Sequence, residues 1–461
     1  MKSKNLLLLL ILLTYIQNLD ITGRNFVLKD GESTLDGTKL SSTPTDGVSY
    51  SNQGISITES GTYILSGTLN GQLSVSVPEK IVLVLNGVTI TSTTNGIIIL
   101  KASEIDQNNP LNPSSFSVNL ENVGAKIIIA DGTENTVKGG NSGEHDGAIH
   151  TCVSLLFAGE TKGDGVLNVI SSGEGIESDL HLFFNGGIIK VIGNDDAINA
   201  HEENRSIVYV KSGKLFINGG LGQEGDGIDS NGYIIIDGGE IVSSAKAGLD
   251  SGLDSEHTTI NGGNIFAVGS ALDYASDKCT QPTMNLIFKD NIEPSSVLTI
   301  KDSDGNEITS YCANKADFVS GSERKTFNAA IVSHPNFKSG GVYHVFLDGS
   351  QLGFTGNQPG IDWSQGFPGG GMPWGGNQGG NQQWPGGNQQ WPGGNQQWPG
   401  GNQQWPGGNQ QWPGGNQQWP GGNQQWPGGN QGNQQNDNAE IKTDFILGNS
   451  ATSFSGIRKI L

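Results

Sequence analysis

The chain has 461 residues, a formal net charge of −20 and 71 glycines, although only 15% of its residues are charged. Such an acidic chain lacks the Lys and Arg that would neutralise a phosphate backbone, so its composition argues against nucleic-acid binding. It favours cations, or surfaces reached through a bridging cation, although clustered acids would equally serve solubility alone.

Residues 1–20 are typical of a secretory signal peptide. Lys2 and Lys4 precede an apolar run, Leu6 to Leu13, which is too short for a membrane span. The alternative is a buried first strand or a short anchor, but no other run of the sequence is as hydrophobic. We therefore expect a secreted or cell-surface protein without a membrane span.

Residues 24–280 predict a stack of short strands. Strand-like runs such as Ile81 to Ile90 come first, and a polar excursion over residues 102–118 interrupts them. From residue 145 on, an acidic turn leads repeatedly into a small residue and a branched apolar anchor. The anchors recur at intervals of 21 to 30 residues and are Ile149, Ile176, Ile198, Ile228, Leu249 and Leu272.

Glycine turns such as Asn185-Gly186-Gly187 and Asn261-Gly262-Gly263 recur with nearly the same period as the anchors. Two interleaved markers with a shared period indicate a stacked repeat, because one repeat alone cannot bury its apolar side. The β-branched runs show no helical periodicity. We therefore expect an all-β fold, a right-handed parallel β-helix solenoid with the anchors as an interior ladder.

The repeat fades towards the C-terminus. Residues 281–350 hold further strand-like runs, and we expect them to form a β-rich cap that protects the open end of the solenoid. Residues 355–437 repeat Trp-Pro-Gly-Gly-Asn-Gln-Gln, which predicts a disordered low-complexity tail. Its evenly spaced indoles could stack on sugar rings, or the tail could be a simple linker. Residues 438–461 form a short C-terminal segment with some apolar character.

Three cysteines and one sequon are candidates for covalent chemistry. An oxidising compartment would permit Cys279 and Cys312 to pair, whereas Cys152 fits an inward strand position as a buried thiol. Asn204 begins Asn-Arg-Ser, an acceptor sequence for N-glycosylation.

Stacking would bring the acids of successive repeats together. Equivalent positions of neighbouring strands lie about 4.8 Å apart. One predicted column holds His150, Glu177, Asn199, Asp229, Asp250 and Asp273, and another holds Gly147, Glu174, Asp196 and Asp226.

Like charges stacked so closely repel each other, and calcium, which takes about six to eight oxygen ligands, would offset that repulsion. Asp and Asn at such turns are also explained by turn geometry alone. The predicted calcium ligands come from Glu174, Glu177, Asp195, Asp196, Asp226, Asp229, Asp250 and Asp254.

Residues 50–350 resemble a carbohydrate-binding parallel β-helix family of bacterial cellulose degraders. The segments that carry the resemblance include Gly61 to Gly67, Val84 to Ile90, Ala130 to Asn135, Asp146 to Ile149 and Gly225 to Ile228. The resemblance implies a pectate-lyase-like fold that binds calcium, cellulose and acidic pectic polymers. The excursion at 102–118 and the Trp repeat depart from the family's pattern.

Catalysis has a weaker basis in the sequence than binding. Polysaccharide lyases of this fold use calcium with a basic residue, and Arg205 is the sole arginine of the repeat region. No Ser-His-Asp arrangement is suggested, and the scattered histidines fit structural or surface roles. We expect a secreted protein that binds plant-cell-wall polysaccharide, cellulose or pectic polygalacturonate, with calcium. The alternatives are a calcium-dependent polysaccharide lyase and a structural matrix or surface protein.

Overall fold

The computed structural model describes residues 21–103, 119–140, 145–222, 225–246, 250–270, 273–358 and 440–460. The chain divides into two units, Met1–Ile361 with Glu440–Leu461, and Asp362–Ala439. The predicted signal peptide, most of the excursion at 102–118 and almost all of the Trp repeat tail lie outside the described residues. Within the described ranges the chain is built from strands, with one 3-10 turn, η1 (Ala313–Lys315).

The first unit begins with short hairpins that lead into longer strands. Strands β1 and β2 pair antiparallel, as do β4 and β5, and β1 then pairs in parallel with β6. The bounds are β1 (Arg24–Leu28), β2 (Thr34–Leu35), β3 (Thr38–Lys39), β4 (Val48–Ser51), β5 (Gly54–Ile57), β6 (Gly61–Asn70), β7 (Gln72–Ser76), β8 (Ile81–Thr91) and β9 (Ile97–Lys101).

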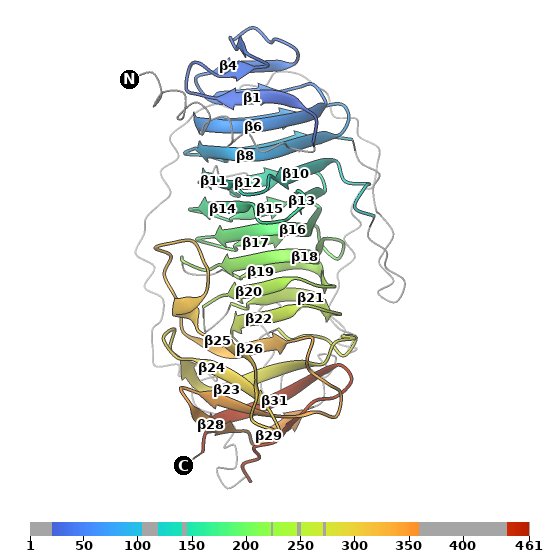
Figure 1. Cartoon of the computed structure of the whole chain (residues 1–461), viewed down its shortest axis with the longest axis vertical. Helices are drawn as coiled ribbons and strands as arrows, with labels where there is room; N and C mark the ends of the chain where they lie inside the picture. The colour runs from blue at the N-terminus through green and yellow to red at the C-terminus, as the bar shows by residue number, and fades with distance from the viewer. Residues whose placement is uncertain are drawn as a thin grey trace, which may run out of the picture. The chain divides into compact units, whose positions relative to one another are not determined.

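The middle of the unit continues as parallel strands that follow one another in chain order, from the blue strands to the green ones in Figure 1. The bounds are β10 (Ala125–Ile129), β11 (Glu134–Gly139), β12 (Ile149–Thr151), β13 (Leu155–Gly159), β14 (Val166–Ser171), β15 (Ile176–Ser178), β16 (His181–Ile192), β17 (Ile198–Ala200), β18 (Ile207–Asn218), β19 (Ile228–Ile236), β20 (Glu240–Ser244), β21 (Leu253–Ile260) and β22 (Asn264–Gly269).

Three runs of parallel pairings link these strands. The first joins β8, β10, β13, β16, β18, β19 and β21. The second joins β8, β11, β14, β16, β18, β20 and β22. The third, called the site stack below, joins β7, β9, β12, β15, β17, β19 and β21.

The all-β class is confirmed, but the predicted right-handed parallel β-helix solenoid is corrected. Six strands, β8, β10, β13, β16, β14 and β11, pair in parallel in a closed ring, and the other strands lie outside it. The reason lies at glycines within the strands, two of which, Gly186 and Gly187, were predicted above as a turn between strands. Strands β8 and β16 continue through Gly87 and through Gly186 with Gly187, all three at positive φ, so each strand bends and pairs on two sides.

The core of the stacked part is a ladder of branched apolar side chains. Ile97, Ile149, Ile176, Ile198, Ile228 and Leu253 succeed one another in register, and none is exposed to solvent. Full burial of each such side chain stabilises the fold by about 1.5–3 kcal/mol. The sequence analysis placed Leu249 after Ile228, but the register partner of Ile228 is Leu253. Leu249 and Leu272 lie outside the described residues.

Beyond β22 the strands become largely antiparallel, and β26 pairs with both β22 and β23. A second core of aromatic and aliphatic side chains lies among these strands. The bounds are β23 (Thr283–Ile292), β24 (Leu298–Asp302), β25 (Glu307–Tyr311), β26 (Phe327–Ser333), β27 (Val342–Leu347), β28 (Ser350–Gly353), β29 (Gly356–Gln358), β30 (Phe445–Ile446) and β31 (Ala451–Lys459).

Residues 440–460, set apart above as a short C-terminal segment, are built into this second core. Strand β31 pairs in parallel with β23 and antiparallel with β28 and β29, and Phe445 and Phe454 are fully buried. Residues 356–358, assigned above to the low-complexity tail, form β29 instead.

Candidate functional site

The site stack carries a column of polar side chains immediately after its apolar anchors. Parallel pairing places His150 beside Glu177, Glu177 beside Asn199, Asn199 beside Asp229 and Asp229 beside Asp254. The predicted column is therefore present from His150 to Asp229. It then continues with Asp254, whereas the sequence analysis continued it with Asp250. Gly252-Leu253-Asp254-Ser255 echoes Gly227-Ile228-Asp229-Ser230, a sequence signal that the 21-residue spacing to Leu249 obscured.

A second column lies in the turns that precede the same strands. The N–H groups of Ala148, Gly175 and Ala197 donate to the carbonyl oxygens of Glu174, Asp196 and Asp226, so these turns stack one on the next. Carboxylates also bond along the column. The N–H of Asp226 donates to Asp196 Oδ1 at 2.6 Å, and the N–H of Ser251 donates to Asp226 Oδ1.

Five aspartates at the β19 and β21 end form a group, called the carboxylate cluster below: Asp196, Asp226, Asp229, Asp254 and Asp273. Burial raises the pKa of Asp226 to about 10 and the pKa of Asp229 to about 8, and neighbouring carboxylates add to both shifts. Burial likewise raises the pKa of Asp196 to about 7, and it raises the pKa of Asp254. Joint ionisation of these groups at neutral pH is therefore unfavourable, and a cation among them would offset their mutual repulsion.

Glu174 and Asn199 present oxygens that nothing in the described part of the chain satisfies. Glu174 is 9% exposed and Asn199 is 8% exposed. Asn199 Nδ2 donates to Glu174 Oε1 at 2.7 Å, while Glu174 Oε2 and Asn199 Oδ1 have no hydrogen-bond partner among the described residues. Burial, followed by the charges of Glu177 and Asp196, raises the pKa of Glu174 to about 10. Buried orphan oxygens of this kind suit a calcium ion, which takes only oxygen ligands.

The other end of the columns carries histidines. His150 is fully buried, with Nδ1 2.8 Å from Glu177 Oε2, and the Gly147 N–H donates to the same oxygen at 2.9 Å. Burial opposes ionisation of Glu177, but the close His150 imidazole and the Gly147 N–H outweigh it and lower the pKa of Glu177. Ligand atoms of Asp146, Glu174 and Glu177 lie within 4.8 Å of one another, so Glu177 joins the histidines to the carboxylates.

Comparison with known proteins bears on this region directly. A family model described as carbohydrate-binding domain-containing protein matches residues 51–108 and 111–330, which include both columns. The chain belongs to this family. A carbohydrate-binding domain-containing protein of Acetivibrio thermocellus is 30% identical over an alignment of 209 residues, and the match covers 41% of this chain and 66% of that relative. The chain thus spans slightly less than two thirds of the relative's length.

A solved structure titled as the polysaccharide lyase-like protein from C. thermocellum, a gadolinium derivative, is 24% identical to this chain. The match covers 53% of this chain and 90% of that one with a TM-score of 0.39, a likeness too low to decide fold or function.

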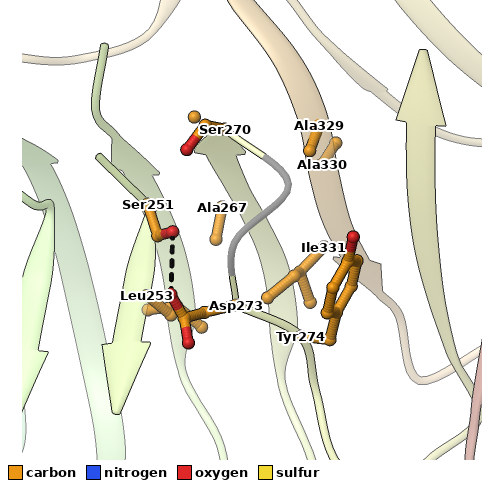
Figure 2. Close-up of a pocket in the computed structure, with 11 residues that line it drawn as sticks. Ser251, Leu253, Ala267, Ser270, Asp273, Tyr274, Ala329, Ala330 and Ile331 are labelled. Atoms are coloured by element: carbon orange, nitrogen blue, oxygen red, sulfur yellow. Dashed lines mark hydrogen bonds between the residues drawn. The ribbon is translucent and has the colours of Figure 1, made fainter. Parts of the chain in front are cut away.

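The carboxylate cluster of this carbohydrate-binding domain ends at a small pocket (Figure 2). Asp273 faces the pocket from one side and accepts a 3.1 Å hydrogen bond from Ser251 Oγ, while Tyr274 and Ile331 lie across from it. Burial and then Asp254 raise the pKa of Asp273 to about 8. The lining residues are Ser251, Gly252, Leu253, Ala267, Gly269, Ser270, Asp273, Tyr274, Ala329, Ala330 and Ile331.

The structure distributes the eight predicted calcium ligands unevenly. Glu174, Glu177, Asp196, Asp226, Asp229 and Asp254 lie in the two columns. Asp195 is exposed, and Asp250 is buried three residues before Leu253, outside both columns. The sequence analysis did not include Asp146, Asp273 and the histidines among these ligands. The repeat signal was available for Asp146, because it precedes Ile149 in the same phrase that carries Glu174 before Ile176.

Aromatic side chains suited to stacking on neutral sugars are mostly buried. Five aromatic side chains of β16, β18 and β19 are the candidates for such stacking: Phe183, Phe184, Tyr209, Phe216 and Tyr233. Phe183 and Phe184 are fully buried, Phe216 is 7% exposed and Tyr209 is 9% exposed, which leaves Tyr233 partly accessible. Arg205, the candidate lyase base, pairs through Nη1 with Glu202 Oε1 at 3.2 Å. Asn204 is exposed, as a glycosylation acceptor must be, and its glycosylation stays a prediction.

The suggested pairing of Cys279 with Cys312 is absent, and both are buried free thiols. Cys279 belongs to the ladder core and accepts the Ile260 N–H, whereas Cys312 lies 3.6 Å from the Pro294 carbonyl oxygen. Cys152 was expected to be buried, but it is half-buried beside His150, with Sγ 3.4 Å from Nε2.

Proposed function

We propose that this protein is a secreted binding protein whose carbohydrate-binding domain holds calcium in its stacked carboxylates and binds an acidic, pectic-type polysaccharide through that calcium. Family membership supports carbohydrate binding, and the signal-like residues 1–20 support secretion. The carboxylate cluster carries the calcium inference, because joint ionisation of its half-buried aspartates is unfavourable without a cation among them.

Acidic polymers suit this domain better than neutral ones. The net charge of −20 repels a polyuronate unless a cation lies between the two surfaces. A calcium ion has more ligand positions than two or three carboxylates fill, so it can accept uronate oxygens as well. Stacking on cellulose has less support, since four of the five aromatic candidates are buried.

The domain's own residues have distinct tasks in this proposal. Glu174 and Asn199 offer orphan oxygens in the middle of the columns, and the carboxylate cluster offers further oxygens at the β19 and β21 end. The branched ladder beneath, from Ile149 to Leu253, fixes the spacing of these groups. No helix in the described part of the chain has the length and hydropathy to cross a membrane.

A pull-down of the full chain on insoluble polygalacturonate and on cellulose, with calcium and with chelator, tests the proposal. We expect calcium-dependent retention on polygalacturonate and no unsaturated product. Equal retention on polygalacturonate with and without chelator would contradict binding through calcium. Rising absorbance of unsaturated uronate would identify a lyase instead. Self-association without binding to either polymer would favour a matrix protein.

A further inference from the structure

The polar column after the anchors, and a further column two residues beyond it, hold residue types that ligate transition metals. Column positions His150, Glu177 and Asn199 pair across β12, β15 and β17. Two residues later, Cys152, Asp179 and His201 occupy equivalent places, because the N–H of Asp179 donates to Thr151 and that of His201 donates to Ser178. These three residues lie immediately after the strand ends. Asp179 Oδ1 is 3.6 Å from His150 Nε2 and 3.4 Å from His201 Nε2, so both columns face one region.

His145, His150, Glu177 and Asp179, called the histidine cluster below, offer ligand atoms that all lie within 4.8 Å of one another. The rings of His145 and His150 stack with centroids 3.9 Å apart. His150 Nδ1 lies 2.8 Å from Glu177 Oε2, and its Nε2 lies 3.6 Å from Asp179 Oδ1. Four donors around a zinc ion at bonds of about 2.0–2.2 Å would lie roughly 3.3 Å apart, within reach of these separations.

The buried imidazole gives a second observation. The His150 side chain is 0% exposed, and Nδ1 makes no hydrogen bond of acceptable geometry within the described residues, although Glu177 Oε2 is close. His150 Nδ1 therefore meets Glu177 as a close ion-pair partner without a well-aligned hydrogen bond, and coordination of a metal ion would use that nitrogen fully. The side chains of Asp179 and His201 are 33% and 42% exposed, so an ion can reach the buried imidazole from solvent past them.

The geometry points to a second cation site in this domain, in which the histidine cluster binds a zinc-class transition-metal ion. Two imidazoles and two carboxylates form a donor set that suits zinc, nickel or copper, whereas calcium takes oxygens. The polar column after the anchors thus begins with a nitrogen donor at His150 and ends with oxygen donors from Asp229 on. Cys152, which shares a ligand group with His145 and His150, is the adjacent sulfur donor.

Zinc titration of the metal-stripped full chain, in excess calcium and followed with a chromophoric chelator, tests this site. The variants are His145→Gln and His150→Gln, and exposed His257→Gln on β21 is the matched control. We expect one zinc per chain in wild type and the control, and at least about tenfold weaker binding in both variants. Cobalt in place of zinc should give the visible absorption of a four-coordinate ion.

Circular dichroism checks that each variant folds. If the buried His150→Gln variant fails that check, the half-buried His145→Gln variant decides the question. Absence of zinc binding in excess calcium would overturn the site, and so would wild-type affinity in a folded His145→Gln variant. Calcium-dependent polysaccharide retention is measured separately, so its failure leaves the zinc result intact.

Discussion

At the residue scale, the carboxylates of this domain are held in places where charge is unfavourable. Asp229 stands between Asn199 and Asp254 in register, and burial with Asp196 raises its pKa to about 8. Such an arrangement destabilises the empty protein and favours whatever cation relieves it. This placement supports the proposal that the acids are cation ligands rather than solubilising groups.

The Asp229→Asn variant separates the cost of burying this carboxylate from its contribution to cation binding. In chelator the variant should unfold at a higher temperature, with a gain on the order of 1–3 kcal/mol, because an amide needs no ionisation. In calcium the variant should gain less stability than wild type, because it lacks one ligand. Thermal unfolding with chelator and with calcium measures the stability of the empty protein and the gain from calcium. Asp290→Asn, at an exposed position, is the control and should change neither quantity. A variant destabilised in chelator would contradict this account.

The same pKa shifts predict how stability depends on pH. The folded chain keeps protons on Asp229 and Asp273 up to about pH 8, whereas an unfolded aspartate releases its proton near 3.8. The folded state therefore binds more protons in this window, so the free energy of unfolding falls as pH rises through it. Denaturant titrations in chelator should show this fall, and calcium should reduce it. Rising stability across the window would be the opposite result.

At the scale of elements, β31 shows how a segment distant in sequence completes the structure. It pairs with β23, β28 and β29, and Phe454 contacts Phe354 and Phe445 with ring centroids 5.0 and 4.9 Å apart. The low-complexity repeat lies between β29 and β30 in the sequence. The C-terminal strands are thus part of the same unit as the site.

Deleting residues 440–461 should cost more than about 5 kcal/mol, because Phe445, Leu447, Phe454 and Ile457 each lose a burial worth about 1.5–3 kcal/mol. Replacing residues 362–439 with a Gly/Ser linker should leave the melting temperature nearly unchanged. Thermal unfolding of the two variants is the comparison. Equal melting temperatures for the 440–461 deletion and wild type would show that β31 does not stabilise the domain.

At the scale of the whole molecule, the charge of −20 repels an acidic polymer, so the proposed binding needs a bridging cation, for which we propose calcium. Polygalacturonate with methyl-esterified carboxyls should therefore not be retained, whatever the calcium concentration, while the de-esterified polymer is. Sedimentation with both polymers measures this. Equal retention of the two would mean that the domain recognises the sugar ring rather than its carboxylate.

The sequence by itself determined the all-β class, the ladder of anchors from Ile149 to Ile228 and most of the carboxylates, because in-register parallel strands turn a repeat into a column. It did not determine the closed ring of β8, β10, β13, β16, β14 and β11. Whether a strand stops or bends at Gly87 or Gly186 depends on the strands beside it.

Only the tertiary structure placed Leu253 as the next anchor, put Asp254 in the column where Asp250 was predicted and gathered His145, His150, Glu177 and Asp179. Those residues lie on separate turns and strands, and their spacing in sequence varies with the lengths of the loops between them. The contact that gives them a shared chemistry exists only once the strands have stacked.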